Sequence, residues 1–116
     1  MASVIRLSEH RRKPPYQHFT RPELNRLLGL YATRVAKGEW RDYAIHLGPD
    51  AATFAVFRHA HEHPLFVISK LAPGRGGRAK RQPQYVVASP QRKLAQANTL
   101  GDALAVFDRP IKLVSG

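Results

Sequence analysis

Residues 19–38 read FTRPELNRLLGLYATRVAKG, and this stretch predicts the element around which the rest of the fold is arranged, an amphipathic helix. Thr20 and Glu23 have the spacing of a capping box, in which each side chain accepts a hydrogen bond from the other residue's backbone amide. Pro22 falls in the first turn, where a missing N–H has no helical partner to lose. We therefore expect a helix over about residues 21–37.

The apolar side chains of this helix recur at helical spacing and predict one buried stripe. The stripe comprises Leu24, Leu27, Leu28, Tyr31 and Val35. Gly38 follows the last turn, where a residue in the left-handed conformation commonly ends a helix. We expect Leu28 to be buried against the rest of the fold.

Apolar runs with short connections follow the helix and predict an antiparallel meander. The runs cover residues 43–47, 53–58, 65–69 and 84–88, with a weaker fifth run over 94–97. A last helix is expected from Thr99, whose spacing to Asp102 suits a cap, to just before Pro110. The sequence thus predicts one α+β domain over residues 19–114: a four- to five-stranded antiparallel meander with the N-terminal and C-terminal helices packed on one face.

Composition narrows the compartment and the class of protein. A chain of 116 residues fits a single domain. It has no cysteine, which excludes disulfides and thiolate metal sites and fits a reducing compartment. No apolar run approaches the ~18 residues of a membrane-spanning helix, and the opening residues 1–7 hold too short an apolar run for a secretion signal. We therefore expect a cytoplasmic protein.

The charge balance predicts a polyanionic partner, because 19 Lys and Arg against 8 Asp and Glu give a net charge of +11. Residues 1–18 are predicted to form a basic flexible tail, and the glycine- and proline-rich residues 72–83 a flexible basic loop. No acidic residue lies between Glu62 and Asp102, where the cations are Lys70, Arg75, Arg78, Lys80, Arg81, Arg92 and Lys93. We expect the loop and the turn after residue 89 to place most of them on one rim of the sheet. This pattern favours non-catalytic binding of an anionic macromolecule, nucleic acid foremost.

An alternative reading assigns the charge to solubility and to protection of strand edges. The protein is then an interaction or assembly factor that contacts a protein partner through Trp40 and Arg41, or through an exposed sheet edge. Tryptophan and arginine are enriched in interface hot spots. Trp40 is equally typical of a core residue, with Arg41 and Asp42 forming a local ion pair.

The densest chemical feature is the run of His59, His61 and His63. In an extended strand these three imidazoles share a face and could converge on one metal ion. Their position directly before Pro64 is more typical of a solvated turn, so we predict no metal site and no cofactor. No phosphate-binding loop, paired carboxylates or nucleophile–histidine pattern occurs, and we expect no enzymatic activity.

Three blocks carry a family resemblance: Glu23-Leu24, residues 38–45 (GEWRDYAI) and residues 108–114 (DRPIKLV). Together they resemble a small bacterial family catalogued as domain of unknown function 2794, over roughly residues 19–114. The resemblance implies a stand-alone bacterial cytoplasmic protein and implies no activity. The order of elements is also similar to a double-stranded RNA-binding domain, but residues 98–103 lack the lysines with which that family contacts phosphate.

Overall fold

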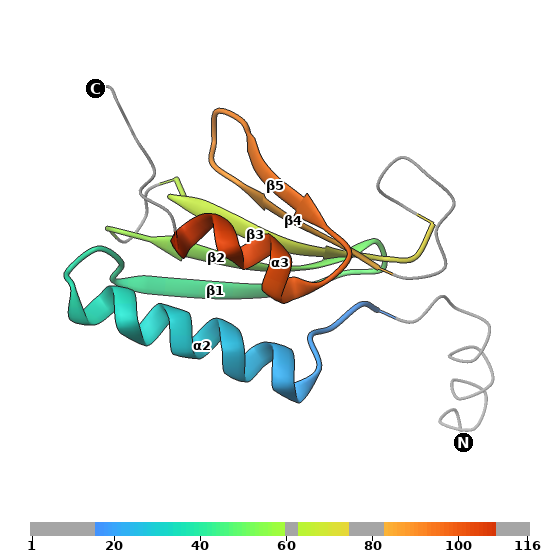
Figure 1. Cartoon of the computed structure of the whole chain (residues 1–116), viewed down its shortest axis with the longest axis horizontal. Coiled ribbons are helices and arrows are strands. Elements are labelled where there is room, and N and C mark those ends of the chain that lie inside the picture. The colour runs from blue at the N-terminus through green and yellow to red at the C-terminus, as the bar shows by residue number, and fades with distance from the viewer. Residues whose placement is uncertain (1–15, 60–62, 75–82, 109–116) are drawn as a thin grey trace, which may run out of the picture.

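The computed structural model describes residues 16–59, 63–74 and 83–108 (Figure 1). The predicted tail as far as residue 15 and the loop over 75–82 therefore lie outside the described residues. The elements follow in the order α2 (Arg21–Ala36), β1 (Asp42–Leu47), β2 (Ala51–Phe57), β3 (Phe66–Leu71), β4 (Gln84–Ala88), β5 (Lys93–Ala97), α3 (Leu100–Leu104) and η1 (Ala105–Asp108), a 3₁₀-helix.

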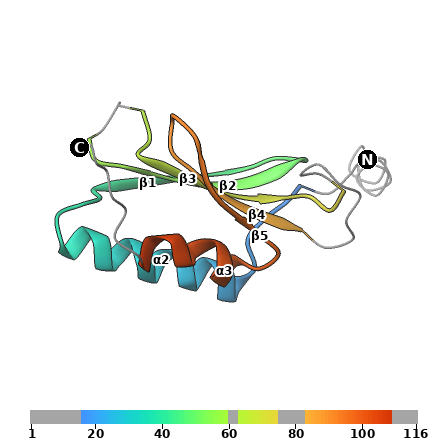
Figure 2. The ribbon, with the colours of Figure 1, turned by 45° about the horizontal axis from the view of Figure 1, so that its top comes forward.

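The five strands form one antiparallel sheet in the order β1-β2-β3-β4-β5. Each strand pairs with its neighbours along the chain, so the predicted meander is confirmed, including its fifth strand. Figure 2 shows α2 and α3 on the same face of this sheet. The molecule is therefore a two-layer α+β fold, with helices on one face of the sheet.

The core lies between the helices and the sheet. Burial alternates along β2, with Ala52, Phe54 and Val56 inaccessible to solvent. Phe54 lies opposite Ile68, and Ile68 opposite Val87. Cross-strand partners in a sheet share a face. These fully buried side chains therefore form a row across three strands, in one cluster with Leu27 of α2.

The start of α2 has the geometry that its sequence predicts. The Thr20 hydroxyl accepts from the Glu23 amide at 3.2 Å, and the Glu23 Oε1 accepts from the Thr20 amide at 2.8 Å. At the other end Gly38 has a φ of 78°, the left-handed conformation that glycine adopts without strain. The predicted helix is confirmed. Across the described residues, no helix combines the length and apolarity needed to cross a membrane.

The predicted buried stripe of α2 needs correction. Leu27 is fully buried, whereas Leu28 is only half-buried and Val35 is 40% exposed. In the last turn the inward position belongs to Arg34, which donates through Nη2 to the Phe107 carbonyl. The inward face therefore follows residues 27, 31 and 34, an i, i+4, i+7 row that leaves Val35 at its solvent side.

The C-terminal helix is shorter than predicted. Thr99 caps α3 by accepting from the Asp102 amide at 3.1 Å, as its spacing indicates. After Leu104 the chain continues as η1, whose Phe107 is 4% exposed. The tighter 3₁₀ turn still carries this aromatic ring into the core.

Replacement of Leu27 by alanine tests the face of α2. The Leu27→Ala variant removes a fully buried side chain and should lower the free energy of unfolding by roughly 2–5 kcal/mol. Asn25→Ala, at an exposed position of the same helix, should change it by less than about 0.5 kcal/mol. Urea denaturation of both variants measures the difference, and equal losses would contradict this orientation of the helix.

Candidate functional site

One carboxylate joins three elements at the start of α2. Besides capping the helix, Glu23 Oε1 accepts from the Lys70 Nζ of β3 at 2.9 Å. Its second oxygen accepts from the Tyr85 hydroxyl of β4. The side chains of Lys70 and Glu23 are only 12% and 16% exposed, so the pair is largely withdrawn from water. The sequence predicted the capping role of Glu23 but gave no sign of its contacts with β3 and β4.

These contacts set the protonation of the cluster. Burial raises the pKa of the Glu23 carboxyl, but the hydrogen bonds from Lys70, Tyr85 and the Thr20 amide together outweigh burial and hold this pKa below its ordinary value. Burial, and then the neighbouring Glu23, raise the pKa of the Tyr85 phenol above its ordinary value. Glu23 is therefore a carboxylate, and Tyr85 a neutral donor, at physiological pH.

The chain entering the fold and the β3–β4 connection meet at the same end of the sheet. Lys70 Nζ donates to the His18 carbonyl at 3.1 Å, and the Gln17 amide donates to the Gly48 carbonyl at 2.8 Å. The Ala72 amide, just past β3, donates to the Asp50 carbonyl at 2.8 Å. Figure 1 shows the blue segment before α2, the green β1–β2 turn and the yellow segment after β3 on the same side of the molecule. We call this end, formed by residues 16–20, 48–50, 71–74 and 83–84, the basic end, because it bears both attachment points of the basic loop and that of the basic tail.

The predicted single rim of cations is wrong in one respect. The loop over residues 72–83 enters β4 at the basic end, whereas Arg92 and Lys93 follow the turn at the far end of β4. The five residues of β4 lie between the two and span about 16 Å. Successive turns of a meander lie at opposite ends of the strand they share, so the loop's attachment points and Arg92 and Lys93 do not share a rim.

The seven predicted cations consequently fall into three groups. Lys70 is paired with Glu23 and is 12% exposed, so its charge is neutralised within the fold. Arg92 and Lys93 are exposed at the far end, where Lys93 Nζ donates to Gln96 Oε1 at 2.7 Å. The other four, Arg75, Arg78, Lys80 and Arg81, lie outside the described residues.

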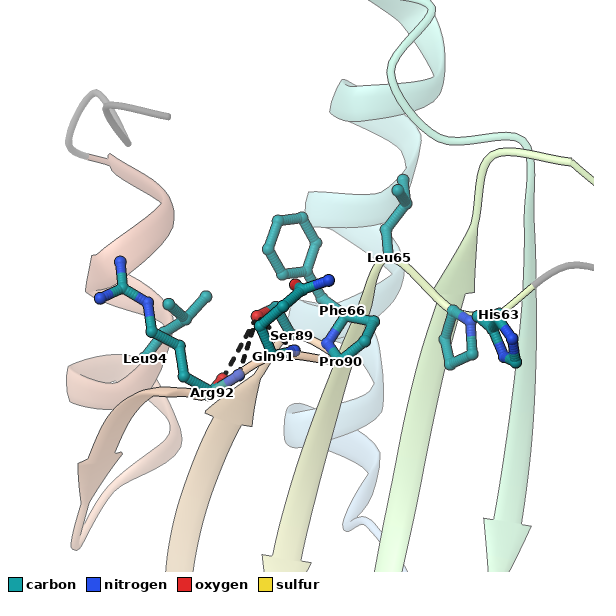
Figure 3. A pocket seen from close by; sticks show the side chains of 9 residues that line it. His63, Leu65, Phe66, Ser89, Pro90, Gln91, Arg92 and Leu94 are labelled. Carbon is teal, nitrogen blue, oxygen red and sulfur yellow. Dashed lines mark hydrogen bonds between the residues drawn. The ribbon is translucent and has the colours of Figure 1, made fainter. Parts of the chain in front are cut away.

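A shallow cavity of about 450 Å³ lies at the far end, between the β2–β3 connection and the β4–β5 turn (Figure 3). Ser89 shapes the turn by accepting through Oγ from the Arg92 amide at 3.3 Å. The lining is His63, Pro64, Leu65, Phe66, Ser89, Pro90, Gln91, Arg92 and Leu94. An apolar floor beside a guanidinium suits a small group with an anionic substituent. Arg92 is the only one of the seven predicted cations among these lining residues.

Trp40 is not available to a partner, which corrects the reading of it as an exposed recognition residue. Its side chain is 2% exposed, and its ring centroid lies 5.5 Å from that of Phe107 in an edge-to-face contact. The Arg34 guanidinium covers the indole at 5.9 Å. Arg41 is exposed, and its amide donates to the Phe57 carbonyl at 2.8 Å. The indole is part of the core at the end of α2, where burial of its large apolar surface stabilises the fold.

The histidine run is only partly described. His59 and His63 are exposed, and His61 lies outside the described residues. Within the part of the chain that the structure describes, no three His, Cys, Asp or Glu side chains gather as metal ligands do.

These features define a class: a small antiparallel α+β sheet domain, strongly basic, whose tail and loop attach at one end. A family model with the description "Protein of unknown function (DUF2794)" matches residues 17–99, and the chain belongs to this family. The family read from the sequence is confirmed, and the match ends before the third block, residues 108–114. No curated protein and no solved structure matches the chain.

The Glu23 cluster makes stability depend on pH in a defined direction. Because the pKa of Glu23 is lower in the folded protein than in the unfolded chain, the carboxylate stabilises the fold above the unfolded value of about 4.3. This contribution is lost as the pH falls through the folded-state pKa. Glu23→Gln should lower the free energy of unfolding by about 1.5–3 kcal/mol near neutral pH, because Lys70 loses its ion partner. In the variant the free energy of unfolding should also decline less as the pH falls.

The matched control is Glu39→Gln, which removes an exposed carboxylate paired with Arg34. Surface pairs contribute little and are screened by salt, so this variant should follow the wild type in high salt. Thermal unfolding from acid to neutral pH measures both. If the melting temperature of Glu23→Gln falls in acid as much as that of the wild type, Glu23 is not the group that makes stability depend on pH.

Proposed function

We propose that this protein binds an anionic macromolecule, nucleic acid foremost, without catalysis, through the cations of its tail and loop at the basic end. The observation that carries the proposal is the convergence of attachment points there. The tail joins the fold through Gln17 and His18, and the loop through Ala72 and Gln84, at one end of the sheet.

Both segments are rich in cations. The tail before residue 16 carries Arg6, Arg11, Arg12 and Lys13 against one acid, Glu9, and the loop carries Arg75, Arg78, Lys80 and Arg81 against none. Eight cations tethered to one end of a small domain produce a local positive potential that raises the encounter rate with polyanions. Arginine forks also bind two phosphate oxygens at once.

The folded part of the basic end is compatible with phosphate nearby. Glu23 would repel an anion if it were unpaired, but Lys70 and Tyr85 satisfy its carboxylate inside the fold. The other described carboxylates near this end are Asp50 and Asp102, the latter in the first turn of α3 just after β5 ends beside the start of β4. The eight cations of the tail and loop outnumber Glu23, Asp50 and Asp102 together with Glu9 of the tail, so the sequence attached at this end carries a net positive charge. We place this function in the cytoplasm of a bacterium, where nucleic acid is abundant and a cysteine-free chain needs no oxidant.

The salt dependence of binding tests the proposal. Each phosphate contact releases condensed counterions, so log affinity falls linearly with log salt, by about 0.9 per contact on duplex and about 0.7 on single strands. Arg78→Gln with Arg81→Gln should reduce this slope by up to about 1.8 units on duplex. The matched control removes the same charge at the far end, Arg92→Gln with Lys93→Gln, and should leave the slope near that of the wild type.

Fluorescence titrations at three salt concentrations, with an oligonucleotide and its duplex, provide the slopes. If the two double variants reduce the salt slope equally, the basic end is not the specific site of binding. A wild-type dissociation constant weaker than about 10⁻⁴ M at physiological salt, the weak limit of non-specific binding, would end the nucleic-acid hypothesis altogether.

A further inference from the structure

β1 is an edge strand whose side chains are all exposed, and it carries an apolar stripe. Tyr43, Ile45 and Leu47 alternate along it and are 39%, 40% and 43% exposed. Their partners on β2 are Val56, Phe54 and Ala52, so the stripe lies on the helix-covered face of the sheet. α2 runs beside this edge (Figure 1), and Tyr43 packs edge to face on Tyr31 of α2 with ring centroids 4.9 Å apart, so the stripe is partly covered and partly exposed. The outer backbone groups of such a strand are a template for another strand.

The opposite edge of the same sheet shows how this protein protects a strand. The β4–β5 ladder has a register shift at Val87/Ala88, and β5 begins with the exposed Lys93. A bulge and an edge lysine are both devices that discourage edge-to-edge pairing. β1 has neither: its ladder with β2 runs unbroken over six pairs, and it contains no lysine, arginine or proline. The β5 edge is therefore guarded, whereas the β1 edge has one outer donor occupied, the Tyr43 amide, which donates to Asp42 Oδ1 at 2.8 Å.

Charge favours a second copy of this chain as the occupant of the β1 edge. With a net charge of +11, two copies repel each other over most of their surfaces. Residues 42–57, which form β1 and β2, carry no lysine or arginine and include Asp42 and Asp50. Pairing along this hairpin therefore sets no cation of the hairpin of one copy against a cation of the hairpin of the other.

We propose that β1 pairs antiparallel with β1 of a second copy, which joins the two five-stranded sheets into one continuous sheet. Paired residues must lie on the same face, so only registers that place odd positions opposite odd positions are allowed. The register centred on Ile45 sets it opposite Ile45 of the second copy and Tyr43 opposite Leu47. Of the two neighbouring allowed registers, the one centred on Ala44 sets Leu47 opposite the charged Arg41, and the one centred on His46 sets Asp42 opposite Asp50, so both are disfavoured.

The resulting dimer has a two-fold axis normal to the sheet, with the helices of both copies on one face. Because the paired strands run in opposite directions, the two basic ends lie at diagonal corners. Such a dimer presents two sets of basic segments to one polyanion, which raises avidity without new contacts. The pairing itself does not depend on the proposed polyanion binding, so either can fail alone.

Sedimentation of nuclease-treated protein across micromolar to millimolar concentrations tests the dimer. Wild type should show a concentration-dependent monomer–dimer equilibrium that strengthens with salt, because salt screens repulsion between the copies. Association bridged by nucleic acid would instead weaken with salt. Ile45→Lys places two like charges opposite each other and should be monomeric with an unchanged melting temperature, whereas Gln96→Lys, on the guarded edge, should dimerise like wild type.

The protein has no cysteine, so a single introduced cysteine can test which residues of the two β1 strands lie opposite each other. Opposed residues in an antiparallel pair have Cα atoms about 4.5–5.5 Å apart, within the range of a disulfide. Ile45→Cys should therefore form a covalent dimer under mild oxidation, and Gln96→Cys should not. A wild type that stays monomeric at millimolar concentration overturns the proposal and leaves the edge to a strand of another protein. Equal crosslinking of the two cysteine variants overturns it as well.

Discussion

The Glu23 carboxylate is the contact on which the arrangement of this fold depends. It caps α2, pairs with Lys70 on β3 and accepts from Tyr85 on β4. Lys70 in turn holds the His18 carbonyl, so the chain entering α2 is bound to the same cluster. Apolar burial supplies most of the stability of such a core but is non-directional. Hydrogen bonds are directional. The Glu23 carboxylate accepts from Thr20, Lys70 and Tyr85 at the same time only when the start of α2 lies in this position over β3 and β4.

This placement gives the two ends of the sheet different chemistry. At one end a neutralised ion pair anchors the segments that lead into the basic tail and loop. At the other end the core consists of aromatic rings in contact, those of Trp40, Phe66 and Phe107. The Arg34 guanidinium lies over the indole, 5.9 Å from its ring centre. Two of the described cations, Lys70 and Arg34, therefore make contacts within the fold. The cations to which we assign binding belong to the tail and the loop.

Local patterns in the sequence predicted the elements well, because caps, helical spacing and short connections act over a few residues. Thr20 with Glu23, and Gly38 after the helix, are local features and fixed the bounds of α2. Lys70 was misassigned because its partner is 47 residues away, and no spacing rule connects a strand lysine to a helix cap. The inward position of Leu27 rather than Leu28 depends on how the helix rotates over the sheet, which apolar spacing leaves open. The splitting of the cations between two ends followed from the meander itself and could have been predicted from it.

We propose that polyanions bind at the basic end and not along the β4–β5 turn. Amide chemical shifts of ¹⁵N-labelled protein, recorded while a short oligonucleotide is added in low salt, test it directly. We expect the shifts among the described residues to concentrate at 17–20, 48–50, 71–74 and 84, where the tail and loop attach. Shifts concentrated at residues 89–94, with the basic end unchanged, would contradict it.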